Sequence, residues 1–483
     1  MAARDRPFGS LKNNFLKGTQ ARNEIAGLPP KIIVMKRNVL SLLVIGVVIT
    51  VITIGYHARE NRIDMLLERN TSIPPGSEWN LRRDYAAALR SKIAKDPADI
   101  RSLLALTTLF IQEARITGNY VYYDKAALKC LNLAIKQDSL NGEALTFKSL
   151  VYLSQHHFAD GLALAEKAHQ VNPFNAFVYG LLVDGNVEMG QYDSAVANAD
   201  RMVSVRPDIR SYSRISYLRE IYGDYPGAIG AMKMAVNAGG EGDETTEWCR
   251  VQLGRLYEYT GDLKSAEMHY AIALDERPGY AFAWAGLARM AMAGKNYQKA
   301  IDYYRKADSM INDYSIKEEC ADAYALAGKA AAADSVASLV IDDLSRDEQR
   351  GMNNENIGHY ADKELAYAYL KVGNYDKALE HALMEYNRRP DNIDANETVA
   401  WAYYCRKQSL QALPYLKAAL KTNSKNPVLL CRAGLIFASL GDQGEAKKLL
   451  QEALRSDPNI AVSLKNSGLE TLRSLEQDEK KIS

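Results

Sequence analysis

Cysteine and phenylalanine are scarce in this chain of 483 residues, and its net charge is close to zero. The five cysteines are Cys130, Cys249, Cys320, Cys405 and Cys431, at wide and irregular spacings, and no Cys-x-x-Cys pair occurs. This pattern argues against a disulfide framework and against a zinc site, so we expect single buried cysteines on helices. The net charge of +1 offers no general attraction to nucleic acid or to a strongly acidic partner.

Sequence signatures of common catalytic sites are also missing. None of the motifs G-x-x-x-x-G-K, G-x-G-x-x-G, H-E-x-x-H and G-x-S-x-G occurs. His156 and His157 are the only adjacent histidines, and neighbouring residues of a helix point in different directions, so they predict no shared metal. We therefore predict a protein that is not an enzyme, with no catalytic residues, no cofactor and no metal. An enzyme with a divergent site inside the fold is the weaker alternative.

One long apolar run lies near the N-terminus. The stretch from Val39 to Tyr56 carries no charge, and most of its residues are Val, Ile or Leu. A helix of this length spans about 27 Å, close to the thickness of the hydrocarbon core. We predict one uncleaved transmembrane helix at 39–56. A cleaved signal peptide is the alternative, which the length of the run and the poor cleavage site oppose.

Basic residues dominate the segment before this run. Residues 1–38 carry eight Lys or Arg against Asp5 and Glu24, and we expect a flexible cytoplasmic tail. The remainder would then lie on the periplasmic side of an inner (cytoplasmic) membrane. Three arginines soon after the run leave a cytoplasmic location as the alternative, and Met35 is an alternative start.

A regular period runs through the remaining chain. Residues of similar type recur at one spacing in the three series Ala378, Ala412, Ala446; Tyr369, Tyr403, Phe437; and Pro390, Ser424, Pro458. A fixed period of about 34 residues, as here, is typical of a repeat protein, in which each unit packs on its neighbours.

One unit, Glu247 to Tyr280, shows the pattern of two helices. Gly254 and Ala266 are small residues at the places where two helices would cross closely. Gly261 readily takes the left-handed conformation that ends a helix, and Pro278 cannot continue the second helix. Each unit is therefore predicted to be a helical hairpin.

These residues resemble the tetratricopeptide repeat (TPR) family. Its signature is matched at Leu253, Gly254, Tyr257, Gly261, Ala266, Ala273 and Pro278. The resemblance covers about residues 82–460 and implies an all-α fold, an α–α superhelical solenoid of about ten helix-turn-helix units. We place the array at 81–460 with a possible kink at 341–358, a stalk at 57–80 before it, and a capping helix and tail at 461–483.

The resemblance also implies a binding surface. In this family the first helices of successive units line a concave groove, and the groove positions fall here on Phe177, Trp248, Arg255, Tyr259, Phe282, Arg289, Tyr360, Lys363, Tyr367, Glu397, Trp401 and Tyr404, among others. Aromatic residues and arginine are enriched at binding hot spots. The expected partners are other proteins or peptides, besides the membrane at 39–56 and no nucleic acid.

The function implied is that of a membrane-anchored scaffold or adaptor, in cell-envelope protein assembly, secretion or quality control. A structural, oligomeric subunit of an envelope complex, with self-association, is the alternative.

Overall fold

The structure is a computed structural model that describes residues 42–48, 50, 63–73, 77–353 and 358–482. The chain divides into two units, Met1–Asp64 and Met65–Ser483. In the first unit, residues 42–48 and 50 are helical and exposed.

The second unit is all-α within its described residues, and no strand occurs there. Its helices follow one another as α3 (Ser77–Lys95), α4 (Ile100–Thr117), α5 (Tyr120–Gln137), α6 (Gly142–Ser154), α7 (Phe158–Val171), α8 (Ala176–Glu188), α9 (Tyr192–Val205), α10 (Ile209–Ile221), α11 (Tyr225–Asn237), α12 (Glu244–Tyr259), α13 (Leu263–Glu276), α14 (Ala281–Ala293), α15 (Tyr297–Asp308), α16 (Tyr314–Leu326), α17 (Ala330–Asn353), α18 (Asp362–Lys371), α19 (Tyr375–Arg388), α20 (Ile393–Cys405), α21 (Ser409–Ala419), α22 (Pro427–Ser439), α23 (Gln443–Leu454) and α24 (Val462–Ile482).

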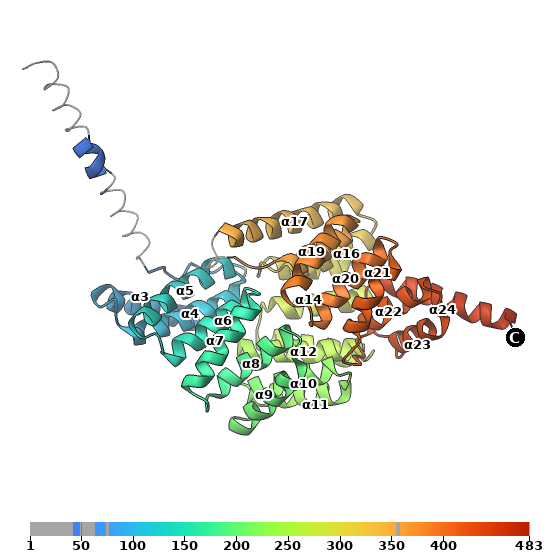
Figure 1. Cartoon of the computed structure of the whole chain (residues 1–483), viewed down its shortest axis with the longest axis horizontal. Helices are drawn as coiled ribbons and strands as arrows, with labels where there is room; N and C mark the ends of the chain where they lie inside the picture. The colour runs from blue at the N-terminus through green and yellow to red at the C-terminus, as the bar shows by residue number, and fades with distance from the viewer. Residues whose placement is uncertain (1–41, 49, 51–62, 74–76, 354–357, 483) are drawn as a thin grey trace, which may run out of the picture. The chain divides into compact units, whose positions relative to one another are not determined.

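Consecutive helices pack as hairpins, from α4 with α5 to α22 with α23 (Figure 1). The first helix of a hairpin also contacts the first helix of the next, for example α6 with α8, α12 with α14 and α20 with α22. The even-numbered helices therefore form a layer of their own, which we call the first-helix layer.

Small residues allow the helices of this layer to approach a large side chain. Tyr270 of α13 is fully buried, and its ring lies between Gly254 of α12 and Gly286 of α14. A Cβ atom at either glycine would come within 2.5 Å of that ring. The helix starts are fixed by side-chain caps, as where Asp262 accepts a hydrogen bond of 3.1 Å from the Ser265 amide before α13.

Two predicted segments differ from their description in the sequence analysis. The stretch 341–358, predicted as a possible kink, is helical as far as Asn353 because it extends the long helix α17. The predicted stalk, 57–80, includes residues that pack on the array: Arg69 bonds to Glu113 of α4, and α3 already begins at Ser77. An ion pair with a fully buried carboxylate fixes this segment to the first hairpin.

The predicted localisation, a single-pass membrane protein anchored by residues 39–56, is wrong. None of the helices in the described ranges is both long enough and apolar enough to cross a bilayer. Within the predicted span only 42–48 and 50 are described, and residues 39–41, 49 and 51–56 lie outside the described residues.

The array winds back on itself, so that its second part contacts its first (Figure 1). The contacts join residues 201 positions apart in the sequence, a separation close to six repeats. The Tyr192 hydroxyl accepts from the Ile393 amide at 2.9 Å, and the Asn459 amide donates to the Glu258 carbonyl at 3.1 Å. We call these the turn-to-turn contacts, since they join successive turns of the superhelix.

A buried carboxylate in the first hairpin gives the stability a pH dependence. Asp124 is 3% exposed, and burial raises the pKa of its carboxyl to about 7, while a hydrogen bond from Ser154 opposes the rise. Because the folded state holds this proton more tightly than the unfolded chain, stability falls as the pH rises from about 4 to 7.

Asp124→Asn is expected to remove this fall of the free energy of unfolding with pH. At pH 8 it should raise the free energy of unfolding by on the order of a few kcal/mol. Urea denaturation of both proteins at pH 5 and pH 8 measures the difference, and an equal slope in the two would contradict it.

Candidate functional site

The twelve predicted groove residues lie on five even-numbered helices, α8, α12, α14, α18 and α20, except Tyr360, which precedes α18. They therefore belong to the first-helix layer or its edge. Their surroundings differ, however. Trp248 packs against two buried apolar clusters, one on each side of α12, and its position is explained by packing between units.

Arg289 is the centre of an ion-pair network across α12, α14 and α16. Its guanidinium donates to Glu258 at 3.0 Å and to Glu319 at 3.2 Å. Arg255 reaches the same Glu319 at 3.5 Å and lies over the ring of Tyr259 at 5.6 Å. Burial opposes ionisation of Glu319, but the two arginines outweigh it and lower the pKa of that carboxyl. Each of these charges is compensated within the protein.

A second network crosses α18, α20 and α22. Tyr367 donates to Glu397 at 2.8 Å, and Arg432 of α22 donates to the same carboxylate at 2.6 Å. The Arg432 guanidinium also lies 5.0 Å from the centre of the Trp401 ring, which stacks on Tyr404.

Lys363 of α18 pairs with Asp394 of α20 at 3.2 Å and holds the pKa of Asp394 below its ordinary value. Together with the Tyr367 network, this contact means that the predicted residues of α18 and α20 mostly bond to one another.

Tyr360 lies at a turn-to-turn contact. Its ring stacks on His157 with centres 4.0 Å apart, and the Arg388 guanidinium covers it at 4.4 Å. Its amide donates to the Gln155 carbonyl at 3.1 Å. Tyr360 therefore holds two turns of the array together.

Phe177, in the first turn of α8, lies where two pockets meet. A pocket of about 630 Å³ extends from Phe177 toward α6 and contains Phe147, and one of about 270 Å³ extends toward α10 and contains Phe174. Phe174 is 81% exposed. The repeat pattern predicts Phe177 as a groove residue but not Phe174, because Phe174 lies in the connection between α7 and α8, outside the family's groove positions.

Arg210, in the first turn of α10, completes this surface. Its guanidinium lies 5.0 Å from the centre of the Phe177 ring. In the part of the chain that the structure describes, Arg210 has no carboxylate within ion-pair distance, whereas its neighbour Arg206 pairs with Asp208 at 3.1 Å. Burial lowers the pKa of Arg210, and Asp208 offsets this only in part. We call Phe147, Phe174, Phe177 and Arg210 the Phe177 surface.

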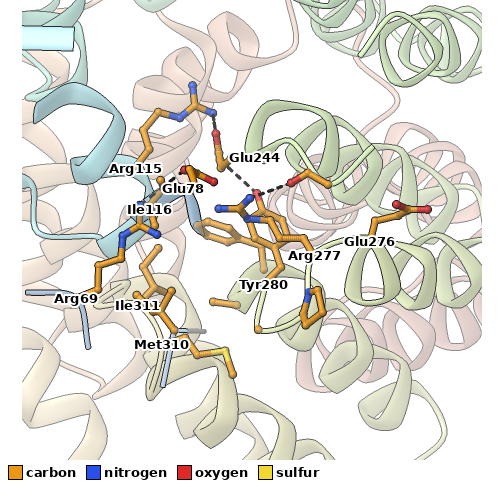
Figure 2. Close-up of a pocket in the computed structure, with 16 residues that line it drawn as sticks. Arg69, Glu78, Arg115, Ile116, Glu244, Glu276, Arg277, Tyr280, Met310 and Ile311 are labelled. Carbon is orange, nitrogen blue, oxygen red and sulfur yellow. Dashed lines mark hydrogen bonds and ion pairs between the residues drawn. The ribbon is translucent and has the colours of Figure 1, made fainter. Parts of the chain in front are cut away.

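Phe282 lines a different pocket, of about 290 Å³, shown in Figure 2. Arg115 and Tyr280 both point to Glu244, at 3.0 Å and 3.4 Å. Arg277 donates to the Gly242 carbonyl at 2.9 Å. Because the polar groups of this pocket bond across it, they hold the loop before α12 against α4 and α14.

Comparison with known proteins bears on the repeats. Tetratricopeptide repeat family models match residues 251–315 and 428–460. None of the curated proteins matches the chain.

Three solved structures illustrate the similarity. A tetratricopeptide repeat protein from Parabacteroides merdae is 17% identical over 50% of this chain and 93% of its own, with a TM-score of 0.40. The TPR protein TTC0263 from Thermus thermophilus is 20% identical over 40% of this chain and 98% of its own, with a TM-score of 0.35. YrrB, described as a TPR protein with an unusual peptide-binding site, is 18% identical over 38% and 94%, with a TM-score of 0.27. Residues 251–315 and 428–460 are therefore tetratricopeptide repeats, within a unit that is all-α in its described residues.

Proposed function

We propose that this protein is a binding scaffold whose first-helix layer captures an extended segment of a partner protein, with the Phe177 surface as the anchor. Tetratricopeptide repeats commonly serve as protein-binding scaffolds, and the chain contains them. The role in cell-envelope assembly depended on the membrane anchor, so it is not part of this proposal.

The observation that carries the proposal is the meeting of two pockets at Phe177, beside an exposed Phe174. Apolar pockets with one aromatic wall bind the aromatic or aliphatic side chains that anchor peptides. The predicted residues on α12, α14, α18 and α20 mostly bond to other residues of the protein. The side chains left to contact a partner are therefore concentrated at the Phe177 surface.

The charge of Arg210 limits which partner segments fit the Phe177 surface. Arg210 lacks an acidic neighbour at ion-pair distance among the described residues and borders the apolar pocket. A carboxylate in the partner would supply the missing charge, and a guanidinium can bind it with two hydrogen bonds. The partner segment is therefore an apolar anchor next to an acidic residue or a C-terminal carboxylate.

Peptide display against the full-length protein tests this proposal. We expect the selected peptides to combine an aromatic or aliphatic residue with an adjacent carboxylate. Phe177→Ala should weaken their binding by about 30-fold and Arg210→Gln by about tenfold, the latter with a loss of salt dependence. Leu410→Ala, at a residue 76% exposed on α21, should leave the affinity unchanged.

Two results would overturn the proposal. One is a set of selected peptides that bind the wild type, Phe177→Ala and Arg210→Gln equally well. The other is concentration-dependent self-association in sedimentation experiments that Phe174→Ser abolishes, which would assign the surface to a second copy of the chain.

A further inference from the structure

Three metal-binding side chains converge where two turns of the array meet. His156 lies in the connection between α6 and α7, whereas His359 and Glu364 lie far later in the sequence, before and within α18. One ligand atom from each lies within 4.8 Å of the other two. The His156 and His359 rings are 4.2 Å apart between centres. Sequence spacing gives no hint of this cluster, because only the turn-to-turn packing brings its members together.

Carboxylate oxygens of Glu364 face both imidazoles. Oε1 lies 3.7 Å from Nδ1 of His156, and Oε2 lies 3.9 Å from Nε2 of His359. Both distances are too long for hydrogen bonds and leave room for an ion between the groups. Glu364 Oε2 is moreover buried without a hydrogen-bond partner in the described structure. A buried carboxylate oxygen without a partner is costly, and a bound cation would satisfy it.

The surrounding backbone holds the two histidines in place independently of any ion. The Tyr360 amide donates to the Gln155 carbonyl at 3.1 Å, and His157 Nε2 lies 2.8 Å from the Gly358 carbonyl. His156 Nδ1 also lies 3.2 Å from the Tyr360 carbonyl. An ion bound at this nitrogen would replace that contact, because one ring nitrogen cannot donate a hydrogen bond and bind a metal at the same time.

The nearby positive charges are already compensated. Lys363 pairs with Asp394 at 3.2 Å, and Arg389 bonds to both Glu188 and Glu385. An ion at the three groups would therefore meet no uncompensated positive charge from Lys363 or Arg389.

We propose that His156, His359 and Glu364 bind one divalent transition-metal ion of the Zn²⁺ class, which fastens two turns of the array. Two imidazoles and one carboxylate suit Zn²⁺, with bonds of about 2.0–2.2 Å and a fourth position for water. Donor atoms around such an ion are about 3.4 Å apart. Small side-chain rotations therefore convert the observed arrangement into a site.

Binding of this ion has a structural consequence. Since its ligands come from segments far apart in the sequence, the ion binds the wound array and not the unfolded chain. Zinc at 100 times its dissociation constant would then stabilise the wound form by about 2.7 kcal/mol.

Titration of the chelator-treated, full-length protein with ZnCl₂ and CoCl₂ tests the site. We expect one Zn²⁺ per chain by calorimetry and visible Co²⁺ absorption of a tetrahedral site. His359→Ala and the isosteric Glu364→Gln should each weaken Zn²⁺ binding at least tenfold and remove the zinc-dependent rise in Tm. His169→Gln, outside the cluster, should bind like the wild type. Circular dichroism confirms that each variant is folded.

The proposal would be overturned if the wild type bound no Zn²⁺. It would equally be overturned if His359→Ala and Glu364→Gln bound Zn²⁺ with wild-type affinity, since the ion would then be bound elsewhere on the chain.

Discussion

Arg389→Ala is expected to lower the free energy of unfolding by about 3–5 kcal/mol. Arg389 is 1% exposed, and its guanidinium bonds to Glu385 of α19 at 2.5 Å and to Glu188 of α8. It also covers the ring of Phe158 at 4.7 Å. The loss exceeds that of an ordinary ion pair because the variant removes charge-assisted hydrogen bonds to two carboxylates, each worth about 1.5–3 kcal/mol. Glu385, only 2% exposed, would keep Arg388 at 3.0 Å as its remaining arginine partner.

An exposed pair provides the matched control for this prediction. Arg219 and Asp224 lie 2.8 Å apart with about half of each side chain exposed, so Arg219→Ala should cost about 0–1 kcal/mol. Arg389→Met combined with Glu385→Gln removes both buried charges and should recover part of the loss of the single variant. Urea denaturation followed by circular dichroism gives the comparison. Equal losses for Arg389→Ala and Arg219→Ala would contradict the prediction.

The repeats themselves could be predicted because their causes are local. Small residues where the two helices cross, here Gly254 and Ala266, and a turn residue, here Gly261, recur with the period. They recur because every hairpin packs on its neighbours in the same way. The structure confirms an all-α array, and the burial of Tyr270 between two glycines shows why tyrosine and glycine occur at these spacings.

The contacts between turns could not be predicted in this way. The bond from Arg389 to Glu188 depends on the small rotation that each hairpin adds to the superhelix. A periodic residue pattern gives no information on the total rotation over six hairpins, which decides which residues of two turns meet. For the same reason the repeat pattern predicts Tyr360 as a groove residue and gives no sign of its contact with His157 in the neighbouring turn. Twelve positions taken from one family pattern could not distinguish side chains that pair with one another from Phe177, which borders open pockets.

The membrane prediction was wrong, since no helix in the described residues is long and apolar enough to cross a bilayer. The prediction rested on the composition of the run Val39–Tyr56, of which only 42–48 and 50 are described.

Gly261→Ala is expected to loosen the turn-to-turn contacts, whereas Gly441→Ala is not. Both glycines have φ of +82° and lie in the turn between the two helices of a hairpin. Alanine in this conformation costs about 1–2 kcal/mol at either site. A Cβ at Gly261 would also overlap the Ser456 carbonyl oxygen in the next turn, while a Cβ at Gly441 meets nothing within 4 Å.

The difference in stability between these two variants therefore measures the contact between turns, because the backbone strain is the same in both. To admit the extra methyl group, the segment around Ser456 must move away from α12. Asn459 would then lose two hydrogen bonds to Glu258, of 3.1 Å from its amide and 2.9 Å from its side chain. At about 0.5–1.5 kcal/mol each, they make Gly261→Ala about 1–3 kcal/mol more destabilising than Gly441→Ala. Urea denaturation measures that difference, and small-angle X-ray scattering should show a larger radius of gyration for Gly261→Ala alone. If both variants lose the same stability and keep the wild-type radius, the two turns do not pack against each other in solution.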